Sequence, residues 1–410
     1  MAVGQGVVTT LKPIKGVRIG VASAGIKQVV RPDVVLFEMV EQATVAGVFT
    51  LNAFCAAPVH VAKEHLAKSS ADHASQRYLL INTGNANAGT GEQGMLDANL
   101  CCDEAAKRLN VSASSVMPFS TGVIGEILPS AKIVNVLDDA IANFQEDNWL
   151  QAAAGIMTTD TRVKGHSVSF DYNNETVSIT GISKGSGMIK PNMATMLGFV
   201  ATDAKIAAPL LQQLLTQASD KSFNRISVDG DTSTNDSCML IATAQSNVEI
   251  SEDDQALLAL FKSHLDELML DIALQIVRDG EGATKLVKIQ CDQAASVQEA
   301  LDVAYTVAHS PLVKTALFAS DANWGRILAA VGRSGVKDLI VDDLQIYLND
   351  VCIVQQGARA QSYTEEQGAA VMAQQEITIR IVLNRGDVND SVWTTDLSHE
   401  YISINADYRS

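Results

Sequence analysis

A threonine with the setting of a nucleophile lies in the segment 181–200, which reads GISKGSGMIKPNMATMLGFV. A threonine hydroxyl is a weak nucleophile at neutral pH and needs a base beside it. If the chain were cut before Thr195, the new α-amine, with an ordinary pKa of about 7.7–8.0, would supply that base. Ala194 is small and leaves its carbonyl accessible, and Pro191 fixes the backbone just upstream. The alternative is a β-branched residue in a buried strand, and these residues alone leave both interpretations open.

A second cluster of small polar residues, Ser120-Thr121-Gly122, is followed by another glycine at position 125. A hydroxyl and a backbone N–H that point at one spot can stabilise the negative oxygen of an acyl-transfer intermediate, as an oxyanion hole. The same pattern also occurs in an ordinary tight turn between two elements. The cluster is therefore a candidate that needs a nucleophile nearby.

Other chemistry is not indicated. Residues 89–94 fit the pattern Gly-x-Gly-x-x-Gly, but they do not directly follow the preceding strand, and residues 112–118 hold no acid. The acids at 229, 231 and 236 lack the calcium-loop pattern, and the seven histidines include no His-x-x-x-His pair. We expect neither a metal nor an organic cofactor.

The composition limits the partners and the location. The net charge is −17, from 30 basic and 47 acidic residues without a basic run, which argues against nucleic acid. No apolar run reaches 18 residues and the N-terminus lacks a signal-peptide pattern, so no membrane contact is expected. The six cysteines are scattered and include no Cys-x-x-Cys pair, which is typical of a reducing compartment. We expect a cytoplasmic protein.

The 410 residues mix strands and helices. Val-rich runs at 16–27, 32–40 and 43–50 and from 78 onward predict strands. Apolar residues spaced by three and four predict helices over 94–110, 203–219 and 252–279, the last with Ser251 as its N-cap. Later segments alternate again. The pattern predicts an α/β or α+β fold with substantial antiparallel sheet, and a weakly marked boundary near residue 285.

The segment KGSGMIKPNMATML resembles the processing motif of the glutamate N-acetyltransferases of arginine biosynthesis, also called ornithine acetyltransferases. The resemblance covers nearly the whole chain. The motifs that carry it, in order, are NTGNANAGTG, STGVIGEILP, IMTTDT, SVDGDTSTND, VRDGEGATK, SDANWGRILAAVGRSG and INADYRS.

The resemblance implies an α/β (α+β) fold of layered sheets flanked by helices, with the αββα order of N-terminal-nucleophile enzymes. It implies a main catalytic domain over 1–285 and a smaller α/β domain over 286–410, whose tail returns to the active site. Cleavage between Ala194 and Thr195 would give an alpha fragment, 1–194, and a beta fragment, 195–410. Two of each would form a heterotetramer.

The resemblance also implies roles for single residues. Thr195 would be the nucleophile, and Thr121 and Gly122 the oxyanion hole. The residues implied to bind the substrate are Thr158, Lys184, Thr195, Glu281, Asn405 and Ser410. The adjacent Thr159 is an alternative to Thr158. Gly89 departs from the Cys expected in many members and touches no implied role, whereas Ser410 keeps the hydroxyl expected at the chain end.

The implied reaction moves the acetyl group from N2-acetyl-L-ornithine to L-glutamate through an acetyl-threonine intermediate. The sequence leaves open whether acetyl-CoA also serves as a donor. A self-cleaving aminopeptidase or amidohydrolase of similar architecture is the main alternative function. A non-catalytic protein that assembles through its apolar surface is a second.

Overall fold

The computed structural model describes residues 2–4, 6, 8–27, 31–72, 78–190 and 196–407. The chain divides into two compact units. The N-terminal unit comprises residues 7–224 and 231–276, and the C-terminal unit comprises 1–6, 225–230 and 277–410. Compactness thus divides the chain after residue 276, whereas the sequence indicates a boundary near 285. The functional division into 1–285 and 286–410 stays a prediction.

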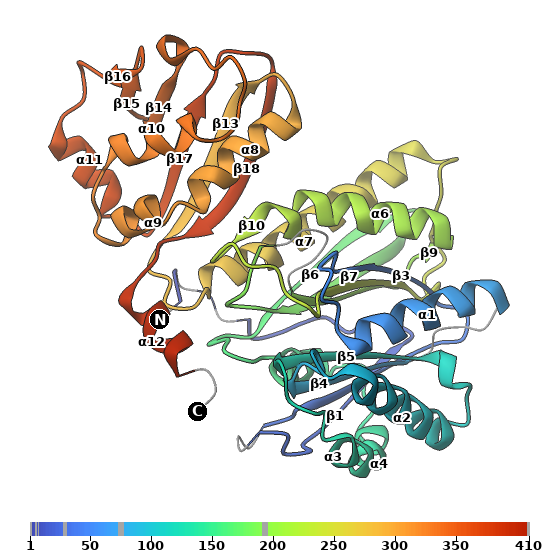
Figure 1. Ribbon diagram of the computed structural model, residues 1–410. Coiled ribbons are helices and arrows are strands. Elements are labelled where there is room, and N and C mark those ends of the chain that lie inside the picture. Colours follow the sequence, from blue (N-terminus) through green and yellow to red (C-terminus); the bar gives the residue numbers. More distant parts are fainter. Residues whose placement is uncertain are drawn as a thin grey trace. The chain divides into compact units, whose positions relative to one another are not determined.

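Two sheets form the centre of the N-terminal unit (Figure 1). The four-stranded sheet has the order β1 (Val17–Ala22), β2 (Val34–Met39), β4 (Tyr78–Asn85) and β5 (Val116–Val123). The five-stranded sheet has the order β3 (Thr44–Phe49), β11 (Ser237–Ala242), β8 (Leu197–Thr202), β7 (Glu175–Lys184) and β6 (Lys164–Tyr172). Every residue of β8 and β11 is buried, which explains why these central strands are apolar without alternation.

An aromatic cluster packs the two sheets face to face. Phe199 of β8 lies 5.5 Å from Phe37 of β2 and 5.2 Å from Phe119 of β5, measured between ring centroids. Trp149 of α5 (Trp149–Gly155) meets Phe37 edge-on at 5.6 Å. Large rings at this interface bury much apolar area, so they fix how the strand ends of one sheet lie over those of the other.

Helices cover the outer faces of both sheets. The four-stranded sheet packs against α2 (Gly91–Leu109), α3 (Ser130–Asn135) and α4 (Leu137–Ala142). The five-stranded sheet packs against α6 (Ala208–Lys221) and α7 (Gln255–Arg278), while α1 (Ala57–Asp72) packs beside β5. Figure 1 shows the resulting order of helix, sheet, sheet and helix. The predicted αββα layering is confirmed.

Two helices begin later than the sequence pattern predicts. The helix expected from residue 203 starts at Ala208, because Pro209 is compatible only with a first helical turn. The residues before it form β9 (Lys205–Ile206), which pairs with β12 (Glu249–Ile250). The helix expected from residue 252 starts at Gln255, since the Asp254 carboxylate accepts a hydrogen bond of 3.0 Å from the backbone of Leu257. Asp254, and not Ser251, therefore caps it.

A seven-stranded mixed sheet forms the C-terminal unit. Its strand order is β10 (Ile226–Ser227), β18 (Val388–Thr395), β13 (Leu286–Ala294), β17 (Glu376–Val382), β14 (Gln345–Leu348), β15 (Val351–Gln355) and β16 (Ala358–Arg359). The helices are α8 (Val297–Ala308), α9 (Pro311–Phe318), α10 (Trp324–Gly332), α11 (Glu365–Met372) and α12 (His399–Ala406). Short 3-10 turns lie at Ala113–Ser115 in the N-terminal unit, at Phe223–Arg225 across the division after residue 224, and at Val341–Asp343 in the C-terminal unit.

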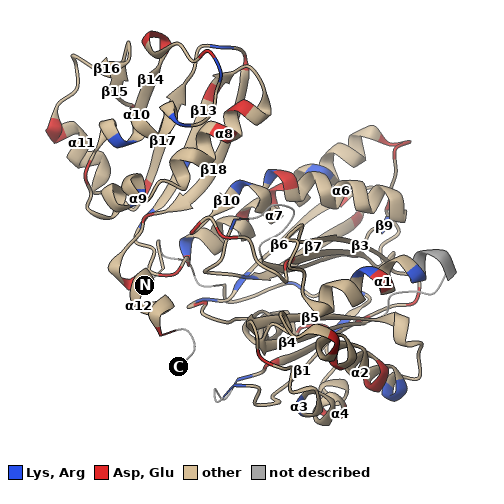
Figure 2. Ribbon diagram, viewed as in Figure 1, with Lys and Arg blue, Asp and Glu red and all other residues tan. Residues whose placement is uncertain are grey.

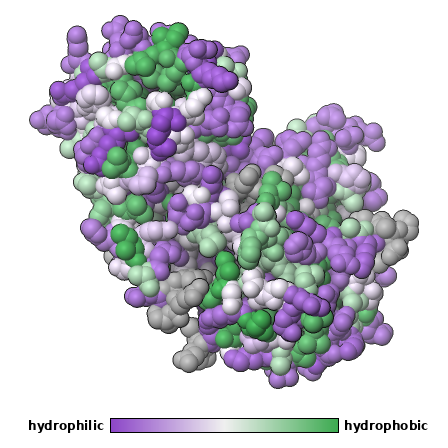
Figure 3. All heavy atoms as spheres, viewed as in Figure 1, coloured by the Kyte–Doolittle hydropathy of each residue, from purple (hydrophilic) through white to green (hydrophobic). Residues whose placement is uncertain are grey.

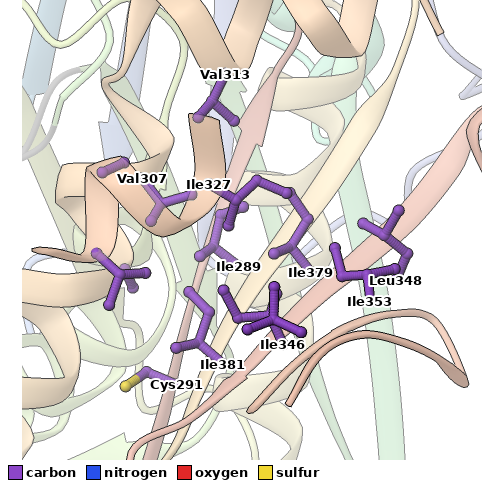
Figure 4. Packing of buried hydrophobic residues seen from close by; sticks show 14 of the residues in the cluster. Ile289, Cys291, Val307, Val313, Ile327, Ile346, Leu348, Ile353, Ile379 and Ile381 are labelled. Carbon is purple, nitrogen blue, oxygen red and sulfur yellow. The ribbon is translucent and has the colours of Figure 1, made fainter. Parts of the chain in front are cut away.

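The core of the C-terminal unit is aliphatic (Figure 4). Isoleucines of β13, β17 and β14 meet valines of α8 and α9, so this unit has a core of its own. Figure 2 shows acidic and basic residues interspersed over the helices, and Figure 3 shows apolar groups at the surface among polar ones. Within the described ranges, no helix has the length and apolar character needed to cross a membrane.

Candidate active site

The Thr121–Gly122 step lies at the end of β5, where β5 comes unusually close to β4. The two strands run parallel with Thr83 opposite Thr121 and Gly84 opposite Gly122, and the register then shifts at Asn85. Gly122 has a φ of 136°, and a Cβ built there would lie 2.2 Å from the carbonyl carbon of Gly84. Only glycine fits this position. The strand end that carries the candidate oxyanion hole is thus fixed by backbone contact.

Lys184, the last residue of β7, reaches across to this strand end. Its Nζ donates a hydrogen bond of 3.0 Å to Oγ1 of Thr121. A lysine ammonium can only donate, so the Thr121 oxygen is the acceptor and keeps its own hydrogen for a further partner. That is the polarity an oxyanion donor requires. The ends of β5 and β7 therefore place a hydroxyl donor and a cation at one spot.

A buried ion pair anchors the backbone next to Lys184. Asp160 accepts 2.6 Å from Nζ of Lys164 and 2.8 Å from the backbone N–H of Gly185, and both side chains of the ion pair are fully buried. Burial alone would raise the pKa of Asp160. The charges of Lys164 and Lys184 and the bonds from Lys164 and Gly185 outweigh burial and hold the pKa well below its usual range. Asp160 is thus an ionised group at neutral pH.

The same carboxylate holds Thr158. Its second oxygen accepts 2.8 Å from the Thr158 backbone and 3.4 Å from the Thr158 hydroxyl. The neighbouring Thr159 hydroxyl is 2.6 Å from the hydroxyl of Ser186. Asp160 therefore joins the Thr158 loop to the end of β7, which brings Thr158, Lys184 and Thr121 into one connected set.

A second buried carboxyl, that of Asp236, lies in the electrostatic field of Lys184. Burial raises the pKa of Asp236 well above its usual range, although bonds from Ser233 and the charge of Lys184 oppose this. Among the described residues, none donates to its buried Oδ2. The field of Lys184 thus acts on both buried carboxyls, and Asp160 is also paired with Lys164.

Glu281 belongs to the C-terminal unit, in the turn between α7 and β13. Its Oε2 accepts 2.7 Å from Nδ2 of Asn405 in α12. Ser398, the N-cap of α12, donates 2.7 Å to the carbonyl of Gly282, so the turn and the helix are joined twice. Gly282 has a φ of 66°, and a Cβ there would lie 2.5 Å from the backbone nitrogen of Tyr401. Close packing against α12 thus fixes the position of Glu281.

Comparison with known proteins decides the family. A family model described as "ArgJ family" matches residues 18–410. The chain belongs to the ArgJ family. The Arginine biosynthesis bifunctional protein ArgJ of Pseudomonas fluorescens (strain Pf0-1) is 57% identical over 411 residues and covers 100% of both chains. The protein of the same name from Pseudomonas syringae pv. tomato (strain ATCC BAA-871 / DC3000) is 56% identical with the same coverage.

A solved structure is also similar. The crystal structure of ArgJ from Bacillus halodurans is 38% identical, with a TM-score of 0.48, and covers 51% of this chain and 97% of that chain. Family membership confirms the resemblance drawn from the motifs, and with it an acyltransferase of arginine biosynthesis. The comparisons do not support the aminopeptidase or the non-catalytic alternative.

The ArgJ fold places most of the residues predicted from the sequence. Thr121, Gly122, Thr158 and Lys184 gather in the N-terminal unit, and Glu281 meets Asn405 in the C-terminal unit. Ala194, Thr195 and Ser410 lie outside the described residues. The roles of all nine residues stay predictions. Among the described residues, no group of three or more His, Cys, Asp or Glu side chains could hold a metal ion.

Sequence reasoning missed Asp160 and Lys164. Asp160 stands in the quoted motif IMTTDT, and Lys164 follows it four residues later. That spacing does not distinguish a buried ion pair from two solvated surface charges. Only the fold shows that the intervening residues turn both side chains inward.

Asp160→Asn should destabilise this ArgJ-family chain by about 3–5 kcal/mol at pH 7, because it leaves Lys164 buried without a counter-ion. The folded pKa of Asp160 is lowered, so its contribution is present above the unfolded pKa of about 3.9 and is lost as pH falls further. Urea unfolding between pH 3 and 7 measures both effects, and the variant should lose less stability on acidification than the wild type.

Asp97→Asn is the matched control, since Asp97 is buried but accepts from the neutral Ser130 and Gln93. Its cost should be about 1 kcal/mol. Equal urea midpoints for Asp160→Asn and the wild type would contradict the structural role of the ion pair.

Proposed function

We propose that this chain transfers the acetyl group of N2-acetyl-L-ornithine to L-glutamate through an acetyl ester on Thr195. The observation that carries the proposal is the contact between Lys184 and Thr121. Lys184 stands opposite Leu197 in the ladder of β7 and β8, and Leu197 follows position 195 by two residues. The donor and the cation therefore lie at the end of β8 that the proposed nucleophile precedes.

The first step is the cut. Oγ of Thr195 attacks the carbonyl carbon of Ala194, and the bond from that carbon to the Thr195 nitrogen breaks. Water then hydrolyses the ester, which leaves a carboxylate on residue 194 and a free hydroxyl and α-amine on Thr195. Ladders between β7 and β8 and between β3 and β11 join the two fragments, so the cut chain keeps its five-stranded sheet.

The second step is acetyl transfer. The Thr195 α-amine takes the hydroxyl proton while Oγ attacks the acetyl carbonyl of acetylornithine, and Thr121 Oγ1 and Gly122 N–H stabilise the oxyanion. The C–N bond breaks, and the proton passes to the departing ornithine amine. The amine of glutamate then attacks the acetyl ester, and N-acetylglutamate leaves as Oγ regains its proton.

Charge supports the remaining assignments. Both substrates carry a carboxylate, for which the ammonium of Lys184 is the proposed partner, with Thr158 beside it. Ornithine also carries amines, for which the carboxylate of Glu281 is the proposed partner. Asn405 bonds Glu281 directly. We therefore assign Asn405 and the following chain end, including Ser410, to substrate binding.

Three further assignments complete the proposal. The relatives are named bifunctional, which supports a second activity, and acetyl-CoA is the donor we propose for it. We propose a heterotetramer of two alpha and two beta fragments. The six cysteines are free thiols, which supports placement in the cytoplasm.

Maturation should yield fragments 1–194 and 195–410, so N-terminal sequencing of the second should read Thr-Met-Leu-Gly-Phe. Thr195→Ala should remain a single inactive chain, because it has no attacking oxygen. Thr195→Ser is the matched variant and should still be cut. Normal cutting of Thr195→Ala would assign the cut to a separate protease.

Thr121→Ala should lower kcat by about 10²–10³-fold with little change in KM, because an oxyanion donor acts mainly in the transition state. Thr83→Ala is the control, since Thr83 is also a buried threonine and stands opposite Thr121, but its hydroxyl donates to the carbonyl of Gly155. Steady-state rates of both cut enzymes test this. A raised KM at unchanged kcat would assign Thr121 to ground-state binding.

Acetyl transfer should follow ping-pong kinetics, because ornithine leaves before glutamate reacts. Double-reciprocal plots at several glutamate concentrations should be parallel, and acetylornithine alone should add one acetyl mass to the fragment beginning at Thr195. The same assay with acetyl-CoA as the only donor tests the second activity. Intersecting lines without an acetylated fragment would mean direct transfer between bound substrates, and Thr195 would lose its role as carrier.

A further inference from the structure

A buried asparagine in the motif SVDGDTSTND links the two sheets of the N-terminal unit. Asn235 is 7% exposed and lies two residues before Ser237, the first residue of β11. Its Nδ2 donates 3.0 Å to the carbonyl of Ser120 in β5 and 2.6 Å to the carbonyl of Ala86, which follows β4. The amide thus bonds the backbone in β5 and just after β4, the two strands that approach closely at Gly84 and Gly122.

Two bonds from the five-stranded sheet therefore reach consecutive residues of β5. Asn235 bonds the carbonyl of Ser120, and Lys184 bonds the hydroxyl of Thr121. The peptide plane that contains the Ser120 carbonyl also contains the Thr121 nitrogen. One bond thus holds the peptide group that contains the Thr121 nitrogen, and the other holds the Thr121 hydroxyl.

Asn235 is also joined to the strand that follows position 195. The backbone N–H of Ser237, two residues on, donates 2.9 Å to the carbonyl of Met196. The hydrogen-bonded path from Met196 to Ser120 thus runs through residues 235–237, which lead into β11. Every contact in this path is made by a described residue.

We propose that Asn235 is a positioning residue that holds the Thr121–Gly122 oxyanion hole in register with β8, the strand that position 195 precedes in the sequence. This inference rests on the proposed function and adds a residue to it. Asn235 acts through Thr121 and Gly122 and does not itself touch the reacting atoms.

An asparagine is well suited to this position. Its amide nitrogen has two hydrogens, one for each carbonyl, and its Oδ1 accepts 2.6 Å from the hydroxyl of Thr234, which fixes the orientation of the amide. Aspartate at neutral pH has the same shape but would point a second acceptor at both carbonyls. Alanine would leave both carbonyls without their donor.

Asn235→Ala and Asn235→Asp should each lower kcat per cut chain by about 10²-fold with KM for both substrates nearly unchanged, because a displacement of about 1 Å has that effect on catalysis. Asn148→Ala is the matched control. Asn148 is 5% exposed, and its Nδ2 likewise donates to two carbonyls, those of Ile19 and Asn143. It should lower the melting temperature about as much as Asn235→Ala and leave kcat unchanged.

A double-mutant cycle with Thr121→Ala separates positioning from general destabilisation. If Asn235 acts through Thr121, then adding Asn235→Ala to Thr121→Ala should cost less than about tenfold in kcat. The inference would be overturned if the losses in kcat of the two single variants multiply in the double variant. An unchanged kcat in Asn235→Ala, or an equal loss of kcat in Asn148→Ala, would overturn it as well. An Asn235 variant that stays uncut while Asn148→Ala is cut supports it, and two uncut variants contradict it. A wild type that acetylates no glutamate would instead overturn the proposed function.

Discussion

A single buried carboxylate, that of Asp160, holds together the parts of the proposed active site in the N-terminal unit. It bonds Lys164, the backbone after Lys184 and the loop of Thr158. A buried charge is costly unless it is paired and fully hydrogen-bonded, so this group has one stable arrangement and resists displacement. The backbone of Lys184 is fixed as well, because the N–H of the next residue, Gly185, donates a hydrogen bond to Asp160. The contact from Lys184 to Thr121 is therefore made from a fixed support.

The two sheets supply the rest of the alignment. Face-to-face packing around Phe199 sets the distance between them, and the glycine approach of β4 and β5 sets the end of β5. Aromatic packing sets the spacing of the two sheets but is not directional enough to orient a single hydroxyl or N–H group. Hydrogen bonds from Lys184 and Asn235 then fix the orientation of the groups on Thr121. Apolar packing at Phe119 and hydrogen bonds at Ser120 and Thr121 thus have separate tasks on neighbouring residues of β5.

The sequence predicted what depends on local pattern. The strands at 17–22, 34–39 and 44–49 and the helix α2 follow from apolar periodicity, and the αββα layering follows from the family resemblance. Helix starts were misjudged where one residue overrides the pattern, as with Pro209 and the Asp254 cap. Thr121 and Lys184 were selected by motif. Asp160 and Asn235 were not, because their roles come from contacts between residues far apart in the chain, and their own neighbours in sequence look like solvated polar residues.

The protein has a negative net charge, so binding of a negatively charged group requires a positive charge close to the site. The chain carries a net charge of −17, yet both proposed amino-acid substrates present a carboxylate and the proposed reaction develops an oxyanion. At physiological ionic strength, charges more than about 8 Å away are largely screened, so the distant acidic surface opposes binding weakly. Within that distance the pairing of residues decides the field. Lys164 is paired with Asp160, and burial raises the pKa of Asp236. The ammonium of Lys184 lies 3.0 Å from Oγ1 of Thr121, so it is the cation that we propose to meet the substrate carboxylate beside the proposed oxyanion hole.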